Sequence, residues 1–303
     1  MPYILKLNIT PRSNTWPVTY FYEPILTEEW KIKMNTYMLK VISKHISNPL
    51  CIGVYLDNEI FWQFKNESWT QSLFEEIHQN ILDATIPVIK KYSPHWIIFS
   101  NKYCYELPIN TSWEWMNWDY IKNNVLARDI NNGVDVICMN KYCANEVDIL
   151  KNGEEFYNLE KSLSDIVGKK ATVFHSEIGF QDNVYERREC KLNGVAGLYQ
   201  RYTSADFPQV SDRMEKGVAY KEVIIRNVKY GGLGYTMTSL CDHGPVYEKW
   251  YEFWKKYKHY SSWGIYEPWR NILYTEILEQ CKLAHEIAID HIINETGLDM
   301  WRY

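Results

Sequence analysis

The 303-residue sequence lacks several signatures that would assign it to a well-defined class. It has no uninterrupted apolar run of the roughly 20 residues that a membrane-spanning helix needs. It has no glycine-rich phosphate loop, so no nucleotide-binding motif is present. Its lysines and arginines are spread along the chain and its formal net charge is −5. We therefore expect neither nucleic acid nor a membrane as a partner.

Cysteine and histidine show no pattern typical of a metal site. The seven cysteines include no CxxC pair, and the eight histidines have no spacing typical of zinc ligands. We expect reduced, structural thiols, no metal and no cofactor. The N-terminus has no basic segment followed by a long apolar core, so no secretory signal is evident. Cytoplasmic residence is the expectation, although export by another route stays open.

Aromatic residues, in contrast, are abundant: they make up 16% of the chain, with 13 Trp and 24 Tyr. Their flat apolar faces and polar edges suit both core packing and stacking on sugar rings. We assign most of them to core packing, and a carbohydrate groove would account for the excess. For Trp113, Trp115 and Trp118, a loop at the rim of a sugar site and a packing role are both open.

Short β-branched runs alternate with longer helix-like segments, which is typical of βα units around a parallel sheet. The expected strands are residues 3–8, 18–22, 50–56, 96–100, 134–139, 171–175 and 233–237. The expected helices are residues 28–47, 70–92, 118–131, 155–167, 212–229 and 269–294. No repeat, linker or low-complexity tract is present, so we expect one domain over residues 1–303. The predicted fold class is α/β, a (β/α)8 TIM-type barrel shortened at its N-terminus.

Two of the expected strands end on a glutamate. The run at 50–56 leads into Asn58 and Glu59, and the run at 171–175 leads into Glu177. In a (β/α) barrel the active site lies at the C-terminal ends of the strands. Two carboxyl groups in unlike surroundings are what glycoside hydrolysis requires, one as an acid and one as a carboxylate. Taken alone, either glutamate could equally well cap the following helix.

These segments resemble those of clan A glycoside hydrolases, which are retaining enzymes with a TIM barrel. The likeness is greatest to β-agarase and β-galactosidase-type families, and it rests on the segments from Gly53 to Glu59 and from His175 to Phe180. Further pieces follow in the order of the family. They are Phe21-Tyr22-Glu23-Pro24, Asp135 to Tyr142, Gly234-Tyr235-Thr236-Met237 with Asp242, and Trp263-Gly264-Ile265-Tyr266. The resemblance spans nearly the whole chain.

The resemblance implies a retaining β-glycoside hydrolase whose substrate is an oligosaccharide or polysaccharide, with β-galactosides as the substrate class. It implies that Glu59 is the general acid/base and Glu177 the nucleophile. It also implies that Asn58 contacts the 2-hydroxyl of the sugar. The other residues that it places near the substrate are Asn140, Tyr142, His175, Asp242 and His243.

The sequence departs from the family pattern in places. The stretch 236–239 lacks the tryptophan that is usual on the final strand, and Asn101-Lys102 stands where an arginine is common. Relatives have three full strands before the Asn-Glu strand, and only about fifty residues precede it here. One or two βα units are therefore expected to be missing, unless a second chain, as in a homo-oligomer, supplies them or the first residues fold unusually. The alternative function is a non-catalytic carbohydrate-binding or structural protein derived from a glycoside hydrolase. Retention of Glu59 and Glu177 favours the enzyme.

Overall fold

The computed structural model describes residues 3–7, 9–11, 21–56, 69–104, 115–141, 146–178, 213–231, 235–237, 266–267, 272–273 and 275–296. The chain divides into two compact units, residues 1–140 with 159–174 and residues 141–158 with 175–303. Each unit has buried apolar side chains of its own. The expectation of one domain over the whole chain stays a prediction.

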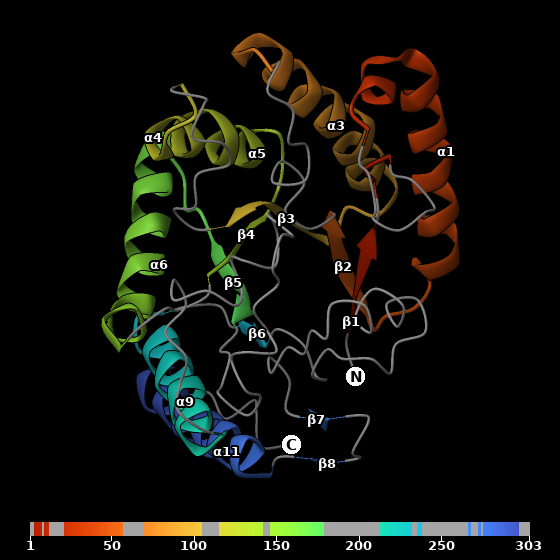
Figure 1. Cartoon of the computed structure of the whole chain (residues 1–303). Helices are drawn as coiled ribbons and strands as arrows, with labels where there is room; N and C mark the ends of the chain where they lie inside the picture. Colours follow the sequence, from red (N-terminus) through yellow and green to blue (C-terminus); the bar gives the residue numbers. More distant parts are fainter. Residues whose placement is uncertain are drawn as a thin grey trace, which may run out of the picture. The chain divides into compact units, whose positions relative to one another are not determined.

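The first unit contains a parallel sheet in the strand order β1-β2-β3-β4-β5 (Figure 1). Its strands are β1 (Tyr3–Leu7), β2 (Cys51–Leu56), β3 (Ile97–Cys104), β4 (Val136–Asn140) and the start of β5 (Val173–Ile178). Neighbours in this order follow one another along the chain. Parallel neighbours need a crossover connection, which is usually a helix, and helices join these strands.

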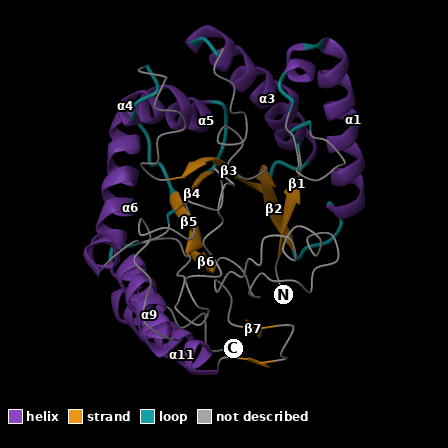
Figure 2. Ribbon diagram, viewed as in Figure 1, coloured by secondary structure: helices purple, strands orange, loops and turns teal. Residues whose placement is uncertain are grey.

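Most helices of the first unit bury some of their side chains, and two long ones, α1 and α3, begin at side-chain caps. The helices are the 3₁₀ turn η1 (Glu23–Leu26), α1 (Glu28–His45), α3 (Gln71–Tyr92), α4 (Trp118–Tyr120), the π-helical η2 (Ile121–Leu126), α5 (Ala127–Asn131) and the end of α6 (Glu146–Val167). Thr27 and Thr70 cap α1 and α3 by accepting from the amides of Trp30 and Leu73. Helices α1 and α3 pack side by side, close to β1 and β2 (Figure 2).

The second unit is built around three helices. They are the first part of α6, α9 (Arg213–Lys229) and α11 (Thr275–Thr296). Helices α9 and α11 pack along each other (Figure 2), burying Tyr220 and Ile224 of one and Ile277 and Ala284 of the other. The remainder of β5 pairs in parallel with β6 (Tyr235–Met237), while β7 (Tyr266–Glu267) and β8 (Ile272–Leu273) form an antiparallel pair.

Most of the expected elements are confirmed, with ends that differ by a few residues. Helix α6 is longer than expected, beginning at Glu146 in place of 155, and β3 continues to Cys104. The strand expected at 18–22 is not found at Phe21 and Tyr22, which lie outside any strand, and residues 18–20 are outside the described ranges. Pro24 explains the difference, because proline suits the first turn of the helical segment η1. A closed eight-stranded barrel stays a prediction.

Three cysteines can be compared with the expectation of structural thiols. Cys51, Cys138 and Cys281 are free and buried. Burial raises the pKa of the Cys138 thiol well above its ordinary value, and that of the Cys281 thiol to about 11. These thiols therefore stay protonated at neutral pH, and the expectation is confirmed for them.

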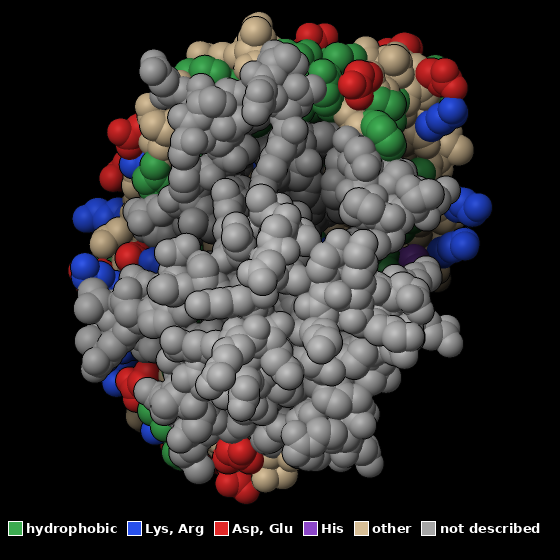
Figure 3. Space-filling view, in the orientation of Figure 1, with side chains coloured by type: hydrophobic (Ala, Val, Ile, Leu, Met, Phe, Trp, Pro, Cys, Tyr) green, Lys and Arg blue, Asp and Glu red, His purple; other side chains and the backbone are tan. Residues whose placement is uncertain are grey.

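The described surface is mixed in charge. In the space-filling view, acidic and basic side chains are interspersed over the coloured part of this face (Figure 3). Such a surface fits the small net charge of −5. Among the helices that the structure describes, none combines the length and apolar character needed to cross a membrane.

Strand β2 passes so close to β3 at Gly53 that a Cβ atom there would collide with the carbonyl oxygen of Ile97. We expect Gly53→Ala to lower the free energy of unfolding by about 2 kcal/mol or more, because one of the strands must move. Ile52→Val is the control, since this neighbouring side chain is partly exposed and should cost about 0.5 kcal/mol or less. Urea unfolding of both variants measures the difference, and equal losses would contradict the close approach.

Candidate functional site

Of the two glutamates marked as catalytic, Glu177 lies in a strand that the structure describes, and Glu59 follows another such strand along the chain. Strand β2 ends at Leu56, two residues before Asn58 and three before Glu59, and these two lie outside the described residues. Glu177 is the penultimate residue of β5. Three of the predicted sugar contacts also lie outside the described residues: Tyr142, Asp242 and His243. The pairing of the two carboxylates therefore stays a prediction.

One face of the sheet in the first unit carries an apolar layer. Phe99, Val136 and Cys138 are buried together, with Tyr55 and Phe174 packed against them. The rings of Phe99 and Phe174 meet edge to face, with centroids 6.2 Å apart. The layer connects β2, β3, β4 and β5 on this face, so it fills the space beneath anything that binds at the C-terminal ends of these strands.

Two buried carboxamides follow this layer toward the C-terminal ends of β3 and β4. Asn140 lies two residues beyond Cys138 and therefore on the same face. The Nδ2 group of Asn101 donates to Oδ1 of Asn140 over 2.8 Å, and both side chains are fully buried. Carboxamides donate and accept hydrogen bonds, which suits sugar hydroxyls. Sequence reasoning marked Asn140 and passed over Asn101, although its place two residues after a buried Phe99 was a usable signal.

Strand β3 is irregular at this point. The pairing with β4 shifts between Ser100 and Tyr103, so that Asn101 and Lys102 together oppose the single residue Cys138. Two residues opposite one make a β-bulge, which bends the strand and is frequent beside active sites. Asn101 is therefore presented from an irregular stretch of strand.

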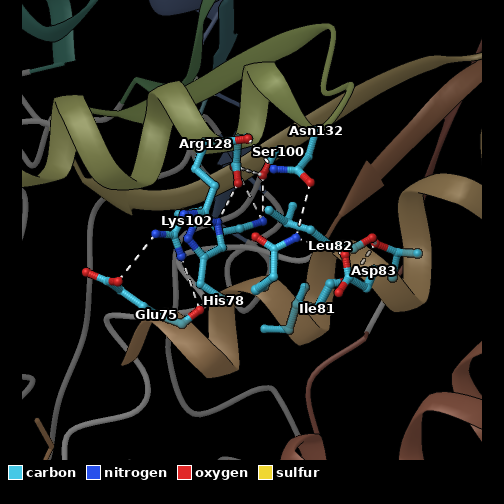
Figure 4. A network of polar contacts seen from close by, with 12 residues as sticks. Glu75, His78, Ile81, Leu82, Asp83, Ser100, Lys102, Arg128 and Asn132 are labelled. Carbon is cyan, nitrogen blue, oxygen red and sulfur yellow. Dashed lines mark hydrogen bonds and ion pairs between the residues drawn. The ribbon is translucent and has the colours of Figure 1, made fainter. Parts of the chain in front are cut away.

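A buried polar cluster lies at Lys102, between the sheet and helices α3 and α5 (Figure 4). The Asp129 carboxylate accepts from Nε2 of His78 at 2.6 Å and from Oγ of Ser100 at 2.7 Å. Nζ of Lys102 donates to Oγ of Ser100 at 2.7 Å and lies 3.6 Å from Oδ2 of Asp129. All four side chains are buried. Each buried charge is thus compensated, as burial of ions requires.

The ionisation of this cluster follows from its surroundings. Burial lowers the pKa of His78, although Asp129 opposes this shift. Burial would raise the pKa of Asp129, but Lys102 and the hydrogen bond from His78 outweigh it, so this pKa is lowered. The native state therefore favours a neutral imidazole and an ionised carboxylate. Within the described ranges, no group of three or more His, Cys, Asp and Glu side chains could hold a metal ion.

A more exposed cluster adjoins the buried one. An Arg128 guanidinium nitrogen lies 3.5 Å from Oε2 of Glu75 (Figure 4). Oε1 of the same carboxylate accepts from the Tyr120 hydroxyl at 2.8 Å. Burial and the contact with Glu75 raise the pKa of Tyr120. The ring of Trp115 packs on Tyr120 and Phe74, with centroids 5.2 and 5.6 Å away. For Trp115 these contacts support packing over a role at a sugar rim.

His175 is buried and contacts a helix and the backbone of its own unit. In the second unit its buried ring stacks on Phe156 of α6, with centroids 4.4 Å apart. Its Nε2 lies 3.1 Å from the carbonyl oxygen of Lys141, which places the proton on Nε2. The ammonium group of Lys141 forms an ion pair with Glu155 of α6. His175 and Glu155 thus fix the chain directly after β4, and the expected contact of His175 with a sugar stays a prediction.

The pairing of β5 with β6 is also irregular. His175 pairs with Tyr235 and Ile178 with Met237, so the register shifts within the segment that contains Glu177. In a regular strand Glu177 would share a face with His175, because alternate residues point the same way. The register shift interrupts the regular pairing within this stretch.

Comparison with known proteins adds information on the fold. No protein-family model matches the sequence, and no curated protein matches it either. Solved structures of glycoside hydrolases are similar in fold. The agarase AgWH50C matches with a TM-score of 0.57 at 12% identity, over 95% of this chain and 44% of that chain. PfGH50B matches with a TM-score of 0.59 at 12% identity, over 96% of this chain and 45% of that chain.

A third neighbour is the GH53 catalytic domain of Ignisphaera aggregans, with a TM-score of 0.50 at 16% identity over 87% of this chain and 66% of that chain. The chain spans less than half the length of the first two neighbours. Identity this low shows the fold alone. The expected α/β fold with a parallel sheet, similar to that of glycoside hydrolases, is thereby confirmed.

The buried cluster predicts that acid destabilises the protein through His78. Because the pKa of His78 is lowered on folding, the unfolded chain takes up a proton below about pH 6.5 while the native imidazole does not. Stability therefore falls as the pH drops below that value, by up to about 1.4 kcal/mol per pH unit for one group. Protonation of the unfolded Asp129 adds to the loss only below about pH 4.

In His78→Gln, whose amide can still donate to Asp129, we expect a weaker dependence of the free energy of unfolding on pH between 7.5 and 5.5. Urea unfolding at several pH values measures it. The control is His285→Gln, since this imidazole is exposed on α11. If His78→Gln and the wild type lost stability in parallel, the neutral native imidazole would be ruled out.

Proposed function

We propose that the chain is a retaining β-glycoside hydrolase of the β-galactosidase and agarase type, with Glu59 as acid/base and Glu177 as nucleophile. The observation that carries the proposal is the place of the two glutamates along their strands. Glu59 follows the end of β2 by three residues, and Glu177 lies one residue before the end of β5. Reacting groups of (β/α) barrel enzymes come from such strand ends. The similar fold of glycoside hydrolases supports the same class.

The reaction takes two steps. In the first, the Glu59 carboxylic acid protonates the glycosidic oxygen while the Glu177 carboxylate attacks the anomeric carbon. The bond to the leaving sugar breaks and a glycosyl ester forms on Glu177. In the second step, ionised Glu59 takes a proton from water, the water oxygen attacks the anomeric carbon, and Glu177 leaves. Two inversions retain the configuration, and the mechanism requires carboxyl groups about 5–5.5 Å apart.

The register shift in β5 supports the role of Glu177. His175 is packed against α6, and in a regular strand Glu177 would follow it to that face. Irregular pairing is a common means of re-aiming a side chain beside an active site. We assign that purpose to the shift between His175 and Ile178.

The carboxamide pair supports a substrate rich in hydroxyl groups. Asn140 and Asn101 carry donors and acceptors and no charge. In the proposal Asn140 contacts a sugar hydroxyl, Asn101 holds the Asn140 amide in place through their hydrogen bond, and Asn58 contacts the 2-hydroxyl. The other proposed sugar contacts are Tyr142, Asp242 and His243. His175 contributes by holding the backbone at Lys141, through the contact that it makes there.

The substrate class follows from the resemblance and from the name of one structural neighbour. AgWH50C is an agarase. Agarose and short β-galactosides are therefore the first substrates to test on this chain. Because the chain spans 44% of that neighbour, its own substrates are a matter for experiment.

Covalent trapping tests the proposal directly. The protein is incubated with a panel of 2-fluoro-glycosides that includes the β-galactoside, and intact mass and peptide mapping follow. A retaining enzyme accumulates its glycosyl ester, so we expect one adduct, located on Glu177. An adduct on another residue would refute the assignment. No adduct across the panel, with binding of agarose oligosaccharides retained, would favour the non-catalytic carbohydrate-binding alternative.

Replacement of each glutamate should give a different kinetic defect. We expect Glu177→Ala to lose turnover by about 10³-fold or more and to regain it partly with added azide, which takes the place of the nucleophile. We expect Glu59→Ala to hydrolyse aryl glycosides with good leaving groups and to fail on alkyl glycosides, since only the latter need a proton donor. Glu286→Gln, an exposed carboxylate on α11, is the control and should match the wild type. Absence of both behaviours would exclude the assigned roles.

A further inference from the structure

Lys102 is an unusual residue to find inside a strand. Its side chain is fully buried, and its ammonium group lies between Ser100 and Asp129. A buried ion pair contributes little net stability, because the cost of desolvating two charges offsets most of their attraction. Apolar side chains of similar size could fill the same volume. The pair therefore calls for an explanation other than stability.

The position of Lys102 in β3 supplies that explanation. Lys102 and Asn101 are the two residues of the bulge opposite Cys138. Their side chains have different partners: Lys102 joins Asp129 in the cluster with the helices, and Asn101 joins Asn140 beyond the apolar layer. Whatever anchors Lys102 also fixes the backbone that presents Asn101.

The cluster is a firm anchor because three elements contribute to it. His78 comes from α3, Asp129 from α5, and Ser100 and Lys102 from β3 (Figure 4). Charge-assisted hydrogen bonds in a dry interior are strong and directional. Moving Lys102 would leave the Asp129 carboxylate buried beside a neutral imidazole, which is costly.

The bulge decides which residues stand beside Asn140. With the bulge, Asn140 pairs with Cys104. Without it, regular pairing from Ser100 and Ile137 onward would set Tyr103 opposite Asn140. A one-residue slip would therefore change the neighbours of both carboxamides.

We propose that Lys102 is a positioning residue, whose salt bridge with Asp129 anchors the bulge of β3 and so holds Asn101 against Asn140. The positioning of the amides can be tested by itself, while its benefit to sugar binding rests on the proposed function. In the proposed reaction Asn101 orients Asn140, the amide assigned to the sugar, and Lys102 acts only through Asn101.

The test removes the charges and keeps the volume. Lys102→Met alone leaves a buried carboxylate without its cation, so the main variant is Lys102→Met with Asp129→Asn, in which His78 and Ser100 keep a hydrogen-bonding partner. The control is Lys90→Met with Asp135→Asn. This pair also joins α3 to the residue before β4, with nitrogen–oxygen distances of 2.8–2.9 Å, but it is 36% and 40% exposed. Asp135 also accepts from the Ile98 amide of β3, ahead of the bulge, and the Oδ1 atom of an asparagine can keep that contact.

The first measurement is NMR of the asparagine side-chain amides, assigned with Asn101→Ala and Asn140→Ala. We expect the main variant to remain folded, while the Asn101 amide protons shift and exchange faster with solvent. The control variant should leave these signals unchanged. Wild-type signals in the folded main variant would overturn the proposal. Should that variant fail to fold, Ser100→Ala, which removes one partner of Lys102 and keeps both charges, is read in the same way.

The second measurement is of hydrolysis kinetics, on a glycoside of whichever sugar forms a covalent adduct in the trapping experiment. We expect kcat/KM to fall by about tenfold to a hundredfold in the main variant, as misplacement of a binding group by about 1 Å can cost. Asn101→Ala should then cause no further loss in that background, while it causes a similar loss in the wild type. If Asn101→Ala lowered kcat/KM by the same factor in the main variant as in the wild type, the coupling between Lys102 and Asn101 would be overturned. If no glycoside is hydrolysed, the proposed function fails, while the NMR result still decides the positioning role.

Discussion

The buried carboxylate of Asp129 is the group around which the described part of the first unit is organised. It accepts hydrogen bonds from α3 and β3 and lies beside the ammonium group of Lys102. A carboxylate without these partners could not stay charged in that place, because desolvation of an isolated ion costs several kcal/mol. Its partners are therefore tightly constrained, and so are the helices and the strand that carry them. The bulge of β3 lies within this constraint.

Polar anchoring of strand ends recurs in the second unit. There, the imidazole of His175 bonds the carbonyl oxygen of Lys141 while its ring stacks on Phe156. Glu155 holds the other end of Lys141 through an ion pair. In both units a buried side chain on a strand fixes backbone next to the residues that the proposed chemistry uses. Loops and strand ends that carry function gain precision from rigid support of this kind.

The sequence predicted the elements well where periodicity was strong. The strands at β2, β4 and β5 and the helices α1 and α3 are found within a few residues of the expected positions. The strand expected at 18–22 is not found at Phe21 and Tyr22, which shows how weakly a short β-branched run predicts a strand. These two residues directly precede the 3₁₀ turn that contains Pro24. Lys102 shows another limit. It stands with Asn101 where relatives commonly have an arginine, and it belongs to a buried cluster with Asp129 and His78, which are 27 and 24 positions away in the sequence.

The sequence by itself determined the order of strands and helices, the α/β class and the place of Glu59 and Glu177 along the chain. Hydrophobic periodicity and turn residues act locally, so they can be read without knowing what each element packs against. Only the tertiary structure decided the two register shifts, the bond between Asn101 and Asn140, and the burial of Lys102 with Asp129. These features depend on partners distant in sequence, and no local pattern specifies which buried charge will meet which.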